Sequence, residues 1–193
     1  MDTNTTIKIV AQGDCFLCQG EDCGTLYSIV EFVEKKCSAK SIFIDKHTVQ
    51  ALECADEYDL ELPNDIVMLP SNTYDTIKVL MLDCVDDMYN ILSEETLDVD
   101  FELEAGALYT DGVSIYRTIQ IKDDRWYYDL FRIGEDFIKD NWTGSCRIDV
   151  AKSAFKPITE STYTKIKLRF EKLQQAIAQL IDQFCSRILP TNR

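Results

Sequence analysis

The most reactive side chains of this chain are its eight cysteines, and three of them lie close together near the N-terminus. Cys15, Cys18 and Cys23 follow the spacing C-x-x-C-x-x-x-x-C, and Cys37 comes further along the chain. Four thiolates at suitable positions can bind zinc tetrahedrally. These residues therefore form a candidate structural zinc site, which we keep as an alternative. The main prediction is a protein without a metal or other cofactor.

Few residues suit acid–base catalysis. His47 is the single histidine, and histidine is the usual general base near neutral pH. Cys15 with His47 is the only pair that could serve a cysteine-dependent hydrolase. The sequence has no phosphate loop of the G-x-x-x-x-G-K-[ST] type, no G-x-S-x-G elbow and no H-E-x-x-H motif. We therefore predict that the protein is not an enzyme.

Acidic residues are concentrated in the middle of the chain. Residues 50–111 contain seventeen acids and one base, whereas residues 152–193 carry a net charge of +5. Within the acidic region, carboxylates alternate with apolar residues from 98 to 104. Side chains two apart on a strand share a face and lie about 6.5–7 Å from each other. The alternation predicts a strand with Val99, Phe101 and Leu103 toward the core and four exposed carboxylates: Asp98, Asp100, Glu102 and Glu104.

Such a row of carboxylates resembles the charge spacing along a nucleic-acid strand. We predict an acidic inhibitor of the immunity or anti-defence type, encoded by a phage or mobile element, that occupies the basic, nucleic-acid-binding surface of a partner protein. Five acids before the row extend the predicted binding surface: Asp83, Asp86, Asp87, Glu94 and Glu95. The alternative is a solvent-facing strand whose charges prevent aggregation.

The net charge of −14 argues against direct binding to nucleic acid or to an anionic membrane. No apolar run reaches the roughly 18 residues that a membrane span requires. Residues 1–6 lack the basic and then apolar order of a secretory signal. We therefore expect a cytoplasmic protein with reduced thiols.

The first third of the sequence predicts alternating strands and helices. The expected order is a strand at Ile7–Ala11, a helix at Thr25–Lys36, a strand at Ser41–Ile44, a helix at Val49–Tyr58 and a strand at Asp65–Leu69.

This order resembles the thioredoxin/glutaredoxin family over residues 7–70, in which a strand, a C-x-x-C motif, a helix, a strand, a helix and a proline before a strand follow one another. The matching residues are Cys15, Cys18 and Pro63. The resemblance implies thiol–disulfide exchange at Cys15 and Cys18, which we keep as a second alternative. The sequence departs from the family where residues 19–24 separate the motif from the helix that would lower the thiol pKa.

The rest of the chain shows clearer periods. Apolar residues three and four apart predict a helix over Tyr74–Ser93, and period-two segments predict a hairpin of Val113–Ile121 with Trp126–Ile133. One further strand is expected at Cys146–Val150, and a long amphipathic helix begins at Thr159. We find no internal sequence repeat.

Together these elements predict an α+β fold with N-terminal β/α units, a central antiparallel meander and a long C-terminal helix. Residues 1–158 would form the compact domain. Residues 159–193 would form the helix, which either packs on that domain or makes a homodimer. The bases at the start of this helix, Lys165, Lys167, Arg169 and Lys172, oppose the helix dipole, so we expect the acidic region to lie near them.

Overall fold

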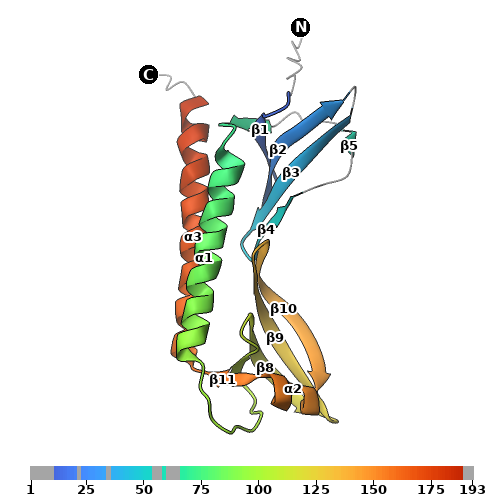
Figure 1. Ribbon diagram of the computed structural model, residues 1–193, viewed down its shortest axis with the longest axis vertical. Helices are drawn as coiled ribbons and strands as arrows, with labels where there is room; N and C mark the ends of the chain where they lie inside the picture. Colours follow the sequence, from blue (N-terminus) through green and yellow to red (C-terminus); the bar gives the residue numbers. More distant parts are fainter. Residues whose placement is uncertain (1–10, 21–22, 34–35, 54–57, 60–65, 189–193) are drawn as a thin grey trace.

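The computed structural model describes residues 11–20, 23–33, 36–53, 58–59 and 66–188. Within these residues, eleven strands form one antiparallel sheet, accompanied by three helices (Figure 1). The first half of the chain contains β1 (Cys15–Gln19), β2 (Cys23–Val33), β3 (Lys36–Asp45), β4 (Thr48–Leu52), β5 (Tyr58–Asp59), β6 (Ile66–Leu69) and α1 (Thr73–Glu95). The second half contains β7 (Leu108–Thr110), β8 (Ser114–Lys122), β9 (Arg125–Gly134), β10 (Phe137–Arg147), α2 (Ile148–Ala154), β11 (Lys156–Ile158) and α3 (Glu160–Ile188).

The two halves of the chain have the same topology. In each half, four consecutive strands form a meander, a later strand pairs with the first strand of that meander, and a long helix follows. The strand order β11-β7-β8-β9-β10-β4-β3-β2-β1-β6 therefore reads the same from either end, with the antiparallel β10–β4 pair at its centre. This duplication of topology has no counterpart in the sequence, where no repeat is visible.

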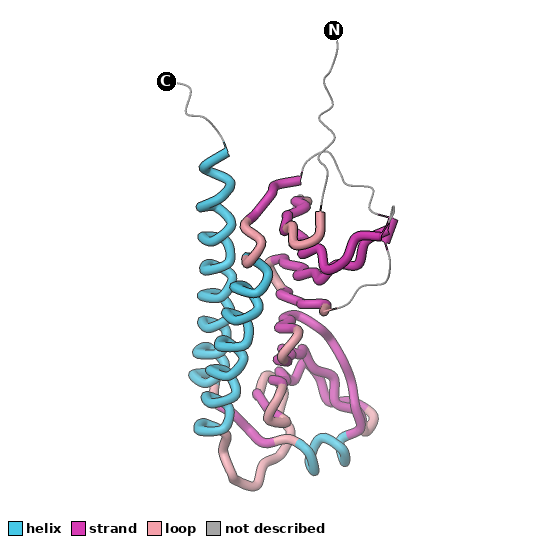
Figure 2. Tube along the Cα trace, turned by 45° about the horizontal axis from the view of Figure 1, so that its top comes forward, coloured by secondary structure: helices cyan, strands magenta, loops and turns pink. Residues whose placement is uncertain are grey.

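The two long helices, α1 and α3, run in opposite directions along one side of the sheet (Figure 2). The main core lies between them and the sheet, where Leu26 and Ile42 from the first half meet Phe131 from the second. From the helices, Met81 of α1 and Phe170 of α3 enter the same core, and both are almost completely buried. The helices therefore connect the two halves of the sheet.

The opposite side of the sheet has its own apolar clusters. In the first half, Phe16, Ile29 and Ile66 are buried together. In the second half, an aromatic cluster around Tyr109, Tyr116 and Trp126 is covered by α2 and by the residues before β7. Parts of the sheet are thus buried on both faces.

Burial on both faces explains why two predicted helices are wrong. Of the predicted helix Thr25–Lys36, residues 25–33 lie in β2 and Lys36 begins β3. Val49–Leu52 lies in β4 rather than in a helix over Val49–Tyr58. Leu26 packs on the helix side and Ile29 on the opposite side. When both faces of a strand are buried, its apolar residues no longer alternate, and their spacing can imitate that of a helix. The N-terminal β/α units are therefore an antiparallel meander.

Other predicted elements agree with the structure. The strands at Ser41–Ile44 and Asp65–Leu69 correspond to β3 and β6, and the helix at Tyr74–Ser93 corresponds to α1. The β8–β9 hairpin turns at Asp123 and Asp124, which both have positive φ, as a two-residue turn of this kind requires. The strand at Cys146–Val150 is only the end of β10, since α2 begins at Ile148. The strand at Ile7–Ala11 lies outside the described residues except for Ala11, which is not in a strand.

The general α+β class is confirmed, because a large antiparallel sheet and long helices occur together. Among the described residues, no helix is both long and apolar enough to cross a membrane.

Candidate functional site

The outer face of α1 is acidic because of how the helix is packed. Its apolar residues at spacings of three and four, such as Ile77, Met81 and Met88, are buried against the sheet and α3. The positions between them are exposed, and they hold the predicted acids Asp83, Asp86, Asp87 and Glu94. Glu95, at the end of the helix, is only partly exposed. Packing therefore turns most of the acids of this helix toward solvent.

The single base of α1, Lys78, does not reduce this charge. Its side chain is only 13% exposed, and its Nζ pairs with Asp136 in the β9–β10 turn. The same ammonium group lies 3.8 Å from a carboxylate oxygen of Glu53 and donates to the backbone oxygen of Glu135 at 3.2 Å. Lys78 thus joins α1 to the middle of the sheet.

The acidic segment after α1 is a loop, so the predicted strand over residues 98–104 is wrong. No described strand pairs with these residues. Nearby, Leu97 donates one backbone hydrogen bond to Pro157 at 3.1 Å. Val99 is 58% exposed rather than turned toward the core. The apolar residues of this alternating segment, Phe101 and Leu103, pack on the aromatic cluster on the sheet side opposite the helices. The alternation of polar and apolar residues therefore does not come from pairing in a strand.

Tyr109 fixes the shape of this loop. Its ring packs on Phe101 with the ring centres 5.1 Å apart. Its hydroxyl group donates to the backbone oxygen of Glu102 and accepts from the backbone N–H of Glu104, both at 3.0 Å. Burial raises the pKa of Tyr109, so the hydroxyl stays protonated and available as a donor. The carboxylates of the loop, Asp98, Asp100, Glu102 and Glu104, are all exposed.

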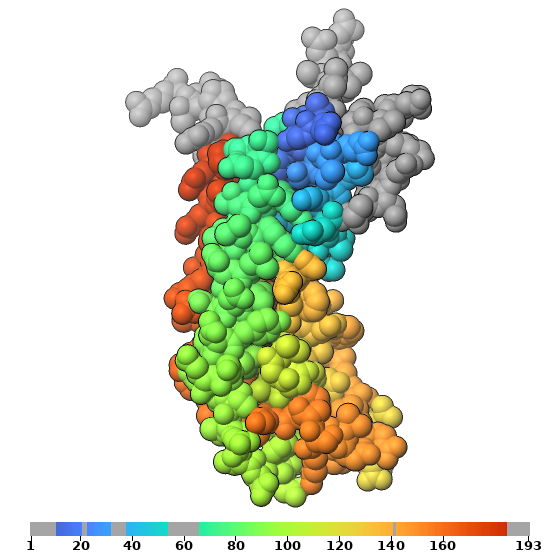
Figure 3. Space-filling view, in the orientation of Figure 1, coloured from blue at the N-terminus to red at the C-terminus, as the bar shows by residue number. Residues whose placement is uncertain are grey.

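Helix α1 and the loop form one continuous surface, which we call the acidic surface and define by the nine predicted acids. Figure 3 shows the column formed by α1 continuing directly into the loop at the lower end of the molecule. The structure therefore places the two predicted groups of acids on two consecutive segments, the helix and the loop that follows it.

Bases from the end of the chain neutralise part of the acidic surface. Lys165 of α3 pairs with Glu95, and Arg169 lies 3.3 Å from Asp87. Lys156 lies 3.0 Å from Asp98, and Lys152 pairs with Glu102. The expectation that the acidic region lies near the basic start of α3 is confirmed for Lys165 and Arg169. Lys167 instead pairs with Asp140 of β10.

Five acids of the surface form no ion pair with a base among the described residues. Within the described part of the chain, no ion pair involves Asp83, Asp86, Glu94, Asp100 or Glu104. By contrast, Lys165 and Thr162 donate to the carboxyl of Glu95 and hold its pKa below the usual value. The surface therefore carries an uncompensated negative charge over both of its parts.

The cysteines form a different arrangement from the predicted ones. Cys15 and Cys18 both lie on β1, with Cys15 in the main core and Cys18 in the cluster on the opposite side. Residues three apart on a strand are about 10 Å apart, beyond the Cα separation that a disulfide allows. Burial raises the pKa of Cys15 to about 11 and also raises that of Cys18. This geometry holds the two thiols apart and protonated.

The helix that the thioredoxin-like layout needs after the C-x-x-C motif is absent from the described residues, because β2 takes its place. Pro63 and the side chain of Cys37 lie outside the described residues, so the four-cysteine zinc site stays a prediction. His47 lies in the turn between β3 and β4, and β2 separates β3 from β1 and its Cys15. In the described part of the chain, no three His, Cys, Asp or Glu residues are grouped to hold a metal ion.

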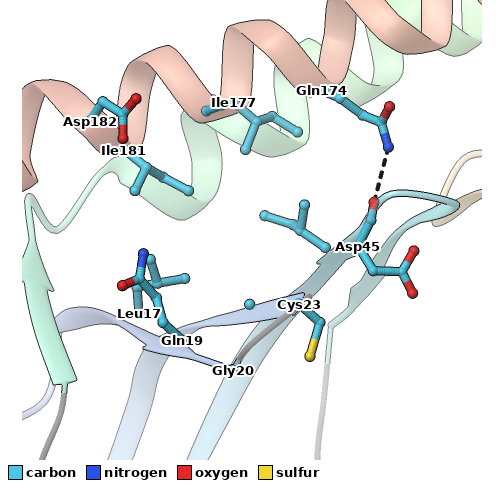
Figure 4. Close-up of a pocket in the computed structure, with 12 residues that line it drawn as sticks. Leu17, Gln19, Gly20, Cys23, Asp45, Gln174, Ile177, Ile181 and Asp182 are labelled. Carbon is cyan, nitrogen blue, oxygen red and sulfur yellow. Dashed lines mark hydrogen bonds between the residues drawn. The ribbon is translucent and has the colours of Figure 1, made fainter.

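A cleft of about 450 Å³ opens between β1, β3 and the second half of α3. Leu17 and Ile177 are buried within it, and Gln174 donates to the backbone oxygen of Asp45 at 2.9 Å. Figure 4 shows Ile177 and Ile181 pointing from α3 toward the strands, while the sulfur of Cys23 points away from α3. The cleft has an apolar interior and a polar rim, but these contacts do not define a reaction.

Comparison of the sequence with models of protein families, with curated proteins and with solved structures found no match.

Proposed function

We propose that this protein is a non-enzymatic, acidic binding protein of the inhibitor or immunity type. Its acidic surface would occupy a basic surface of a partner protein, of the kind that binds nucleic acid, in a cytoplasmic setting such as a phage-encoded countermeasure. The observation that supports this most strongly is the face of α1, where the only base is turned away while the acids face solvent.

The acids project from a helix and from a loop that is held by hydrogen bonds, which distinguishes the surface from a flexible acidic tail. Asp83, Asp86 and Glu94 project from a 23-residue helix whose other face is buried. Asp100 and Glu104 lie in the loop that Tyr109 fixes. Fixed charges lose less conformational entropy on binding than flexible ones, so they give more affinity per contact. They also attract a cationic partner over about a Debye length, which makes association fast and salt-dependent.

The intramolecular ion pairs reduce the negative charge that this surface presents to a partner. Exposed pairs contribute little to stability, so a partner's arginine could displace Lys152 or Lys156 from its carboxylate. The five acids without a cation need no such exchange. We therefore expect them to contribute most to the early, long-range part of binding.

The test uses a fluorescent twelve-residue arginine-rich peptide, preassembled with a short DNA duplex. The protein should displace the duplex, and displacement should weaken between about 50 mM and about 200 mM salt. The triple variant Asp83→Asn, Asp86→Asn, Glu94→Gln should bind the peptide roughly tenfold more weakly, because each exposed charge contributes a fraction of a tenfold factor.

A matched control removes three exposed acids from other places: Glu31→Gln, Glu135→Gln and Glu171→Gln. It makes the net charge less negative by the same amount, so it should change binding much less if position matters. Equal losses in the triple variant and the control would show that only net charge counts. Binding that is unchanged in the triple variant would refute the role of the acidic surface.

A further inference from the structure

The sheet side that faces away from α1 and α3 carries a second charged feature, of opposite sign. Arg132 of β9 and Lys139 of β10 are direct partners in the antiparallel register. Side chains of such partners project from the same face and lie close together. Their neighbours Ile133 and Ile138 face the helices and are buried, so Arg132 and Lys139 point to the opposite side. Two like charges in this arrangement repel each other.

Aromatic rings surround this pair instead of carboxylates. The guanidinium of Arg132 lies 4.6 Å from the ring centre of Phe137 and 5.0 Å from that of Trp142. The ammonium group of Lys139 lies 5.4 Å from the ring centre of Trp142. In the described part of the chain, neither cation has a hydrogen bond or an ion pair with a carboxylate. We call Arg132, Phe137, Lys139 and Trp142 the cation–aromatic patch.

Two of the acids close to this pair in sequence are held on the helix side, and a third, Glu135, is exposed in the β9–β10 turn. Asp136 pairs with Lys78 of α1, and Asp140 pairs with Lys167 of α3. The register of β10 shifts between Lys139 and Trp142, which marks a bulge. A bulge changes the direction of the side chains that follow it, and Trp142 here is 46% exposed. In a chain of net charge −14, two adjacent cations thus form no ion pair with an acid among the described residues.

We propose that the cation–aromatic patch binds a carboxylate of an acidic, partly apolar peptide segment on a partner protein. Arginine offers a planar set of donors that fits a carboxylate in a bidentate manner, and lysine adds a second positive charge. The exposed part of Trp142 offers apolar contact within the patch. Leu52 of β4, which is 46% exposed, follows two residues after Gln50, the register partner of Phe137. A bound anion would also relieve the repulsion between the two cations.

The charge of the whole molecule favours a short acidic segment over a nucleic acid. A polyanion brings many charges into the field of a strongly negative protein. One or two carboxylates bring few, and the two local cations can neutralise them.

The experiment is a selection of random twelve-residue peptides displayed on phage against the wild-type protein, with an excess of the arginine-rich peptide present so that the acidic surface is already occupied. Peptides enriched in Asp or Glu beside apolar residues are expected. One enriched peptide is then synthesised and titrated while Trp142 fluorescence is recorded, since the other tryptophan, Trp126, is fully buried. The variant Arg132→Gln with Lys139→Gln should bind this peptide at least tenfold more weakly, and amide versions of its acids should bind equally weakly.

The control Lys46→Gln with Lys172→Gln removes the same charge from two exposed lysines elsewhere and should bind normally. Without peptide, the Arg132/Lys139 variant should stay folded and melt within a few degrees of the wild type, because the lost cation–aromatic contacts and the relieved repulsion act in opposite directions. A variant that is unfolded at the assay temperature would mean that the cations support the fold and would count against the proposal. Selected peptides without acidic enrichment, or equal binding by the Arg132/Lys139 variant, would overturn the proposal. So would a short oligothymidine that displaces the peptide and binds more tightly at physiological salt.

Discussion

The position of the acidic surface depends on α3, which holds α1 against the sheet, and Phe170 is the residue of α3 that tests this most directly. Its side chain is 2% exposed and lies in the main core. Its ring meets Phe131 of β9 nearly edge to face, with the ring centres 5.8 Å apart. Phe170→Ala would remove this contact and leave a cavity between helix and sheet. Truncation of a buried phenylalanine typically costs about 3–5 kcal/mol.

That loss is a large part of the stability of a typical domain, which is about 5–15 kcal/mol. With a urea dependence of about 2 kcal/mol per molar, the unfolding midpoint should fall by roughly 1.5–2.5 M. The assay is urea unfolding followed by far-UV circular dichroism. Leu168→Ala is the matched control, because Leu168 lies on the same helix but is 48% exposed. Its midpoint should change by no more than about 0.3 M, since exposed substitutions usually cost under about 0.5 kcal/mol.

The measurement also separates packing within the chain from dimerisation. If α3 packs on its own chain, the midpoint of the Phe170→Ala variant should not depend on protein concentration. Equal midpoints for the two variants would show that Phe170 is not a core residue. A wild-type dimer that becomes a stable, folded monomer in the variant would show that the buried stripe of α3 is instead an interface between chains.

Three further predictions follow from single contacts. The pKa of Glu95 is lowered in the folded state. The stability that its carboxylate provides should therefore be present above its ordinary pKa and be lost as the pH falls through the pKa of the folded protein. Glu95→Gln should flatten the acid side of a curve of unfolding free energy against pH. Burial raises the pKa of Cys84 to about 12, so its thiol stays protonated at pH 8. Iodoacetamide should therefore label exposed Cys23 long before Cys84 in the native protein, and equal labelling rates in mass spectrometry would contradict this. Asp124 has a φ of 59°, a conformation that glycine adopts more readily than other residues. Asp124→Gly should therefore raise the free energy of unfolding by up to about 1 kcal/mol. A lower melting temperature of the variant would mean that the aspartate side chain supports the turn.

The sequence was most informative where one period dominated over a long segment. Helices α1 and α3 bury one face each, so their apolar residues follow the helical spacing throughout. The β8–β9 hairpin has a polar two-residue turn between two period-two segments. Such patterns depend on local neighbours, and for this reason they can be interpreted without knowledge of the fold.

The first half was misinterpreted because its strands have apolar contacts on both faces. Leu26 and Ile29 are three residues apart, as on a helix face, but they pack on opposite sides of the sheet. The acidic residues were correctly expected to be exposed, whereas the strand that was expected to carry them is a loop. Its alternation arises from contacts of Phe101 and Leu103 with a cluster that only the folded chain assembles. The sequence contains no local sign of that cluster.

The cation–aromatic patch shows a limit of another kind. Arg132 and Lys139 are seven residues apart, and only the register of β9 with β10 makes them direct partners. From sequence proximity alone, Asp136 and Asp140 are expected to neutralise them, but both are bound by lysines from the helices. The pairing of charges in this protein is thus decided by which side of the sheet a residue faces.

This separation by the sheet makes the two proposed surfaces independent in a testable sense. The α1 part of the acidic surface, with Asp83, Asp86 and Glu94, lies on the helix side, whereas the patch lies on the sheet side turned away from α1. Exposed charges interact weakly beyond a Debye length of about 8–10 Å at physiological salt. Removing Asp83, Asp86 and Glu94 should therefore leave peptide binding at the patch unchanged, and removing Arg132 and Lys139 should leave binding of the arginine-rich peptide unchanged. A change of both affinities in either variant would mean that the sites are coupled through the fold, with the Lys78 contact between α1 and the β9–β10 turn as the first connection to test.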